Sequence, residues 1–364
     1  MKKLLTSESV NCGHPDKTCD IIADSFLDEA LSQDESAQMA VECAIKDNKL
    51  FIYGEATTKA SLDYVQIAKK TLEEIGYDAD SFEFVVQVSK QSQEINNAVV
   101  KSELCANDQG IVFGYACDET KQLMPLPLML AHDLMRTYEE YRKINHDFLA
   151  DAKSQVSVEY DDDRPVKIKT ILVSVSHKDN LSNQEIYELI KANVIGKVLE
   201  SCEVDYSDAE IIINPSGRFT IWGSYGDSGC VGRKIVVDTY GGFAPVGGGC
   251  FSSKNATKVD RSGAYYARYV AKNIVAHNLA KRCLIHVSYG IGIKYPLSID
   301  IDTFGTEKVT KEEIYEFVNK NFDFSVGNMI EELDLLKPIF KDTACYGHFG
   351  NENFSWEKIK LNCK

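Results

Sequence analysis

The segment from Gly247 to Arg261 combines bare backbone, several cations and one carboxylate. Three consecutive glycines let main-chain N–H groups approach an anion closely, and Lys254, Lys258 and Arg261 supply positive charge. Asp260 could hold a divalent cation, and a helix predicted to begin there would point the positive end of its dipole at the same anion. The pattern predicts a polyphosphate site. The alternative is a glycine-rich surface turn before an ordinary helix, because the segment lacks the Gly-Lys-Ser/Thr ending of a P-loop.

A second cluster near the N-terminus brings an imidazole, a carboxylate and an ammonium group into one turn, Gly13-His14-Pro15-Asp16-Lys17. Pro15 fixes the turn, and apolar residues at helical spacing follow it. A His-Pro-Asp turn alone is typical of a capped helix start. Two short segments that each contain several ionisable side chains favour a functional site over two unrelated turns.

These two clusters need elements to position them, and the chain shows one order of elements three times. Helices are predicted to begin near Asp16, Pro125 and Asp260. Each is followed by a pair of alternating strands, at about 38–57, 153–176 and 282–304, and then by an amphipathic helix, at about 61–75, 182–199 and 310–322. The order predicts an α+β fold of three similar β-α-β-β-α-β subdomains related by a pseudo-threefold. Their predicted ranges are 1–100, 101–225 and 226–364.

Composition limits the partners and the compartment. The chain has 364 residues, 44% of them apolar, and a formal charge of −15, so a nucleic acid or an anionic membrane would be repelled over most of the surface. No apolar run reaches the roughly 20 residues of a membrane helix, and the first residues do not form a signal peptide, so we expect a cytoplasmic protein. The eleven cysteines include no Cys-x-x-Cys pair and are interpreted as reduced packing residues.

Many further short motifs follow in order along the chain, and together with the two clusters they resemble the S-adenosylmethionine synthetase (methionine adenosyltransferase) family from end to end. The motifs that carry the resemblance are Ser7-Glu8-Ser9-Val10, Gly54-Glu55, Lys90-Gln91-Ser92, Asp108-Gln109-Gly110, Asp151-Ala152-Lys153-Ser154-Gln155, Asn214-Pro215, Gly217-Arg218-Phe219, Gly226-Asp227, Gly232-Arg233-Lys234, Val237-Asp238-Thr239-Tyr240-Gly241-Gly242 and Tyr346-Gly347-His348-Phe349-Gly350.

The resemblance implies a transferase of one-carbon metabolism. Its reaction is attack of the methionine sulfur on ribose C5′ of ATP, with release of tripolyphosphate and its hydrolysis to pyrophosphate and phosphate. A neutral thioether needs no general base, so catalysis is expected to depend on positioning and on neutralising the leaving group. The resemblance also implies a homodimer with shared active sites that pairs into a tetramer, and it agrees with the predicted three-subdomain fold.

By matching motifs, the resemblance assigns roles to individual residues. His14 and Lys153 would be catalytic and stabilise the leaving group. The residues expected to bind ATP are His14, Asp151, Lys153, Arg218, Phe219, Asp227, Arg233, Lys234, Cys250 and Lys254. Those expected to bind methionine are Glu55, Gln91, Asp108, Asp227 and Lys258. Asp16 and Asp260 would each hold one of two Mg²⁺ ions per active site, and Glu42 would lie at a K⁺ site, although a solvated strand face explains Glu42 equally well.

The chain departs from the family pattern in places. Asn11-Cys12 stands where a Ser-Glu pair is usual, Ser253 replaces a loop glycine that could have supplied a positive φ, and Asn255 replaces an aspartate. The polar stretch from Ser89 to Gly110 is interpreted as a gate over the site, with an extra surface helix as the alternative.

The sequence is also compatible with two other functions. A catalytically silent paralogue could bind nucleotide and regulate a partner, and a generic ATP phosphotransferase could use the same phosphate-binding groups. The joint presence of His14, Asp16, Lys153 and Lys254 disfavours the first. The lack of a P-loop or kinase motif set disfavours the second.

Overall fold

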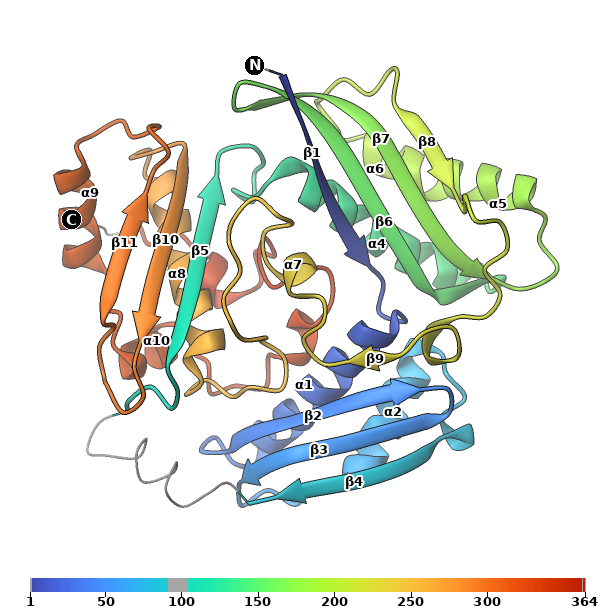
Figure 1. Ribbon diagram of the computed structural model, residues 1–364, viewed down its shortest axis with the longest axis horizontal. Helices are drawn as coiled ribbons and strands as arrows, with labels where there is room; N and C mark the ends of the chain where they lie inside the picture. The colour runs from blue at the N-terminus through green and yellow to red at the C-terminus, as the bar shows by residue number, and fades with distance from the viewer. Residues whose placement is uncertain (1, 91–103, 362, 364) are drawn as a thin grey trace.

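The computed structural model describes residues 2–90, 104–361 and 363. Three sheets surround the segment that carries β9 and α7, and helices pack against each sheet (Figure 1). The sheets have the strand orders β1-β6-β7-β8, β11-β10-β5 and β4-β3-β2-β9. Their strands are β1 (Lys2–Val10), β2 (Gln38–Lys46), β3 (Lys49–Thr57), β4 (Glu83–Ser89), β5 (Gly110–Cys117), β6 (Phe148–Asp161), β7 (Arg164–His177), β8 (Glu210–Ile213), β9 (Gly229–Cys230), β10 (Arg282–Tyr289) and β11 (Ser298–Asp302).

Helices lie close to every predicted position, and two short ones, at 235–238 and 326–332, were not predicted. The helices are α1 (Pro15–Gln33), α2 (Tyr64–Ile75), α4 (Leu126–Ile144), α5 (Asn183–Ile190), α6 (Gly196–Leu199), α7 (Ile235–Asp238), α8 (Val259–Ala276), α9 (Lys311–Asn321) and α10 (Val326–Glu332). α2 begins three residues later than the predicted 61 because the Asp63 side chain caps it by accepting from the Gln66 N–H. A π-helical turn, Lys191–Ile195, separates α5 from α6 inside the predicted helix 182–199.

The three predicted hairpins are confirmed as antiparallel pairs, β2 with β3, β6 with β7 and β10 with β11. Each sheet also contains a strand from a distant part of the chain. β1 pairs with β6, β5 pairs with β10, and the short β9 pairs with β2. The sheets are therefore interleaved along the sequence, which the hairpin pattern alone does not predict.

α1 lies between the end of β1 and the sheet that contains β2 and β9, and it is buried along most of its length (Figure 1). α1 packs against β2 and α2, and its side chains Ile22, Phe26 and Leu27 belong to the hydrophobic core there. Its other buried side carries charged residues, so the helix contributes both to the core and to a polar centre. None of the helices in the described ranges combines the length and apolarity needed to span a membrane.

Candidate active site

The turn between β1 and α1 is held closely against the start of β6. The backbone N–H groups of Asn11 and Gly13 donate to the carbonyl oxygens of Ala152 and Ala150 at 2.9 and 3.2 Å. A Cβ on Gly13 would lie 2.4 Å from Ala150 Cβ, so only glycine allows this approach. The close contact fixes His14, which caps the N-terminus of α1.

His14 is neutral and has a defined tautomer. Burial, with Lys234 and Lys153 nearby, lowers its pKa to about 3. Its Nδ1 accepts a hydrogen bond from the Asp16 N–H at 3.2 Å, so the proton lies on Nε2. The 3.9 Å approach of Nδ1 to Asp16 Oδ2 is therefore not an ion pair. His14 can act as a hydrogen-bond donor through Nε2 without carrying a charge.

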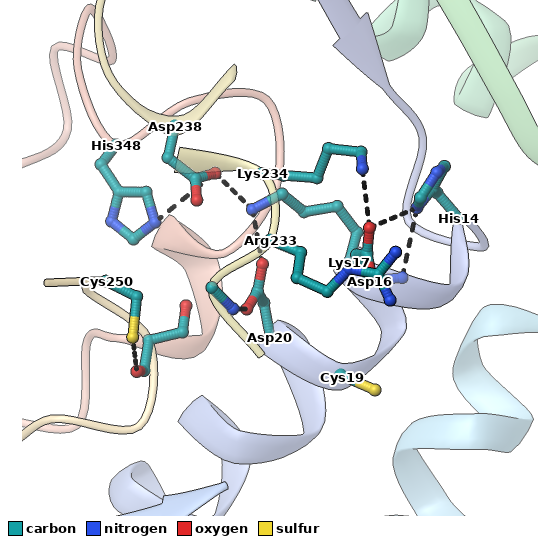
Figure 2. A network of polar contacts seen from close by, with 12 residues as sticks. His14, Asp16, Lys17, Cys19, Asp20, Arg233, Lys234, Asp238, Cys250 and His348 are labelled. Atoms are coloured by element: carbon teal, nitrogen blue, oxygen red, sulfur yellow. Dashed lines mark hydrogen bonds and ion pairs between the residues drawn. The ribbon is translucent and has the colours of Figure 1, made fainter. Parts of the chain in front are cut away.

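Asp16 joins α1 to the segment that carries Arg233 and Lys234 (Figure 2). Its Oδ1 accepts from the Cys230 N–H at 3.0 Å and lies 3.4 Å from Arg233 Nε. Its Oδ2 accepts from Lys234 Nζ at 2.6 Å. A buried carboxylate thus contacts two cations at the N-terminus of α1.

The glycine-lysine segment forms a second carboxylate and cation pair. Lys254 Nζ donates to Asp260 Oδ2 at 2.5 Å, and Asp260 lies in the first turn of α8. A Cβ on Gly249 would lie 2.0 Å from Asp260 Oδ2 and 2.6 Å from Lys254 Nζ. The contact between Lys254 and Asp260 therefore requires glycine at position 249. A Cβ on Gly248, by contrast, would contact nothing within 4 Å.

Arg261 does not supply charge to an anion, and that prediction was wrong. The side chain is buried, and its Nη1 and Nη2 donate to the two carboxylate oxygens of Asp24 at 2.8 Å each. Its remaining donors contact Tyr265 Oη, the Lys254 carbonyl oxygen and Thr343 Oγ1. Because all five N–H groups of the guanidinium are used, Arg261 is a structural residue.

Two of the residues expected to bind methionine, Glu55 and Asp108, lie near a third, Lys258, which is the N-cap of α8. Burial lowers the pKa of Lys258, and the carboxylates of Glu55 and Asp108 oppose this shift. Asp108 and Asp260 also line a cavity of about 760 Å³ with apolar walls that include Ile293. Gln91 lies outside the described residues, and so does most of the gate predicted between Ser89 and Gly110, namely residues 91–103.

Asp151 and Lys153 lie at the start of β6, near His14. Burial raises the pKa of Asp151 to about 6, against the opposing effects of the Gly223 N–H and of Lys153. Its Oδ2 accepts from the Gly223 N–H at 3.0 Å, and its buried Oδ1 has no hydrogen-bond partner among the described residues. Asp227 acts electrostatically on both His14 and Asp151. These residues form one group with Asp16 and Lys234.

The remaining predicted site residues are Cys250, Glu42, Arg218 and Phe219, and they do not all lie together. Cys250 lies beside the Arg233 segment, because a Cβ on Gly232 would lie 2.4 Å from Cys250 Cβ, and burial raises its pKa to about 11. Glu42 on β2 is half-buried and accepts from Tyr53 Oη at 3.5 Å. Arg218 and Phe219 instead contact the end of β7, where Arg218 pairs with Asp179 and the Phe219 N–H donates to His177 Nε2 at 3.1 Å.

The departures from the family pattern have local structural consequences. Ser253 has a φ of +77°, so the positive φ expected at this position is present in a non-glycine residue. Asn255 is hydrogen-bonded to the start of β2, where its Oδ1 accepts from the Met39 N–H at 3.1 Å. Asn11 and Cys12 both donate to Glu139, and burial raises the pKa of the Cys12 thiol to about 12. With these replacements present, the ion pairs of Asp16 with Lys234 and of Asp260 with Lys254 are still formed.

The donor set fits Mg²⁺ bound mainly through a substrate. The described residues contain no cluster of three or more His, Cys, Asp or Glu side chains suited to a metal. Asp16 and Asp260 instead offer one carboxylate each, and each lies beside lysine side chains that suit phosphate. Mg²⁺ commonly binds through one or two carboxylates, water and phosphate oxygens, which matches this arrangement.

Comparison with known proteins assigns the family. Models of the N-terminal, central and C-terminal domains of S-adenosylmethionine synthetase match residues 2–100, 103–219 and 221–358. The chain belongs to the S-adenosylmethionine synthetase family. The S-adenosylmethionine synthase of Mesoplasma florum is 48% identical over 370 residues, covering 99% of this chain and 98% of the relative. Those of Mycoplasma capricolum subsp. capricolum and Sorangium cellulosum are 46% and 43% identical, covering 98% and 99% of this chain and 95% and 88% of the relatives. The family consists of transferases.

Three further aspartates of α1 have specific contacts that the sequence motifs do not predict. Asp20, Asp24 and Asp28 continue from Asp16 at intervals of four along α1, and each accepts backbone N–H groups from loops distant in sequence. The signal was present as four aspartates at helical spacing in a helix otherwise interpreted as apolar on its buried side.

Proposed function

We propose that this S-adenosylmethionine synthetase family member forms S-adenosylmethionine from ATP and L-methionine. The methionine sulfur attacks ribose C5′, the bond from C5′ to the triphosphate oxygen breaks, and tripolyphosphate leaves and is hydrolysed to pyrophosphate and phosphate. The observation that carries this proposal is the pairing of Asp16 with Lys234 beside a neutral His14, together with the second such pair, Asp260 with Lys254. Such a site is suited to a highly charged leaving group.

The roles of His14 and Lys153 follow from charge development. The sulfur of methionine carries no proton, so the reaction needs no general base. Negative charge instead grows on the oxygen that leaves C5′. His14 would donate its Nε2 proton in a hydrogen bond to that oxygen, and Lys153 would supply positive charge beside it.

The phosphate chain would be held by Arg233, Lys234 and Lys254, whose side chains would exchange their carboxylate contacts for phosphate oxygens. Asp16 and Asp260 would then hold two Mg²⁺ ions, which neutralise phosphate charge when bound. Glu42, with the neighbouring Tyr53 hydroxyl, would contribute oxygen ligands to a K⁺ site. Cys250 would contact the nucleotide as an uncharged thiol.

Methionine would be recognised through its charged ends. Glu55 and Asp108 would bind the ammonium group and Lys258 the carboxylate, together with Gln91, while Asp227 would lie between the two substrates. Asp151, Arg218 and Phe219 would bind the adenosine part of ATP. The buried Asp151 Oδ1 supports this role, because an acceptor without a partner is available to a ligand.

The proposal also covers the subdomains, the compartment and the oligomeric state. Three subdomains of similar element order, at 1–100, 101–225 and 226–364, would be related by a pseudo-threefold. The enzyme would be a cytoplasmic homodimer with shared active sites that pairs into a tetramer, with no nucleic-acid or membrane partner. Exposed apolar side chains on the outer face of the β2–β3–β4 sheet, among them Phe51 and Val85, support a subunit interface there.

One assay separates this function from the alternatives. The protein is incubated with ATP, methionine, Mg²⁺ and K⁺, and the sulfonium product, pyrophosphate and phosphate are quantified. The proposal predicts the three products in equal amounts. A phosphorylated acceptor would instead support a phosphotransferase, and ligand binding without turnover would support a regulatory binder.

A further inference from the structure

One stripe of α1 carries four aspartates, Asp16, Asp20, Asp24 and Asp28, which we call the aspartate ladder. Residues four apart lie on the same side of a helix, so their carboxylates form a row along α1. Asp16, Asp20 and Asp24 are almost fully buried. A row of buried carboxylates is costly unless each one is hydrogen-bonded and paired, so their contacts must be specific.

Each member of the aspartate ladder accepts one or more backbone N–H groups from a segment that is distant in the sequence. Asp16 accepts from Cys230 at 3.0 Å, Asp20 from Gly232 at 2.8 Å and Asp24 from Ser253 at 2.9 Å. Asp28 accepts from Phe340 and Lys341 at 2.9 and 2.8 Å. The first three acceptors therefore contact the two loops that carry the proposed phosphate ligands. The fourth contacts a loop near the C-terminus.

Asp20 holds the loop that carries Arg233 and Lys234. The Gly232 N–H that it accepts lies one residue before Arg233. Asp20 Oδ2 accepts from Lys17 Nζ at 2.8 Å, and Lys17 also pairs with Asp238, at the C-terminal end of α7 (Figure 2). The segment from Gly232 to Asp238 is thus fixed at both ends by α1.

Asp24 holds the loop that carries Lys254 in a similar way. It accepts from the Ser253 N–H, one residue before Lys254. Its partner Arg261 also donates to the Lys254 carbonyl oxygen at 3.1 Å. The backbone on both sides of the Ser253–Lys254 peptide bond is therefore tied to the same buried ion pair.

We infer that Asp20 and Asp24 are positioning residues, which set the separation of the two cationic loops so that both engage one polyphosphate. The inference rests on the proposed function and deepens it. Neither residue contacts the anion. Each acts through a backbone N–H next to a cation, and the straight helix between them fixes the distance from one loop to the other.

The test compares Asp20→Asn and Asp24→Asn with Asp28→Asn, which changes the same kind of contact away from the phosphate loops. Binding of tripolyphosphate with Mg²⁺, and separately of methionine, is measured by calorimetry alongside thermal stability. We expect tripolyphosphate to bind about tenfold more weakly to Asp20→Asn and Asp24→Asn, with methionine affinity within about twofold of wild type. Asp28→Asn should lower stability and leave tripolyphosphate binding unchanged.

Equal tripolyphosphate affinity in all three variants would overturn the inference, whereas a wild-type protein that does not bind tripolyphosphate would overturn the proposed function instead. If Asp20→Asn or Asp24→Asn does not fold, the inference is tested instead by amide hydrogen exchange in the wild-type protein. The Gly232 and Ser253 amides should exchange as slowly as the interior of α1. Fast exchange at both positions would contradict the inference.

Discussion

At the scale of single residues, Ser253 is a replacement that the backbone accommodates with strain. Its φ of +77° is unfavourable for a residue with a Cβ, and its buried hydroxyl has no hydrogen-bond partner among the described residues. We predict that Ser253→Gly raises the free energy of unfolding by about 1 kcal/mol, since the relief of strain exceeds the entropy that glycine adds to the unfolded chain. Urea unfolding measures the change. Ser253→Ala is the matched control, because it removes the hydroxyl and keeps the strain, and equal stability of the two variants would contradict the prediction.

Asp151 gives a second prediction at this scale, for the pH dependence of stability. Burial raises its pKa from 3.8 to about 6, so the folded protein holds this proton more tightly than the unfolded chain. Stability is therefore lost as pH rises from about 4 to above 6, by about 3 kcal/mol in total. Asp151→Asn has no proton to lose. Its free energy of unfolding relative to wild type should rise by about that amount between pH 4 and pH 7 in urea titrations, and a constant difference would show that the Asp151 carboxyl is not perturbed.

At the scale of elements, the two adjacent glycines of the glycine-lysine segment differ in what surrounds them. A methyl group on Gly249 would overlap both Asp260 and Lys254, whereas one on Gly248 would meet open space. We predict that Gly249→Ala weakens Mg²⁺-dependent ATP binding by about ten- to a hundredfold, because both side chains must move. Gly248→Ala should leave binding within about twofold. Equal affinities in the two variants, measured by calorimetry, would show that the Asp260 and Lys254 contact does not matter for the nucleotide.

The elements also show what the sequence could predict. Hairpins and their flanking helices were predicted because period-two and period-3.6 patterns are local, and the turn at Asp47, with its positive φ, lies where expected. The pairing of β1 with β6 and of β9 with β2 was not predicted, since it depends on contacts between residues more than 140 positions apart. Arg261 shows the same limit at the site. Its charge in a basic segment suggested an anion, but only the folded chain brings Asp24 to it.

At the scale of the whole molecule, the proposed dimer gives a prediction about the outer face of the β2–β3–β4 sheet. Val85 is half exposed and lies opposite Phe51 on the neighbouring strand, which is also exposed. A charge placed there would have to be buried in a subunit interface, so Val85→Lys should weaken self-association by about a hundredfold or more and reduce activity with it. Sedimentation velocity at micromolar concentration measures the change. Ile144→Lys, at the most exposed end of α4, is the control, and a monomeric wild-type protein with full activity would contradict the proposed assembly.

We propose that the site between α1 and the two cationic loops binds a polyphosphate chain. A crystal structure of the protein soaked with tripolyphosphate and Mg²⁺ tests it most directly. We expect the anion to lie between Arg233, Lys234 and Lys254, with one end next to His14 Nε2. Tripolyphosphate bound elsewhere, away from His14, would contradict it.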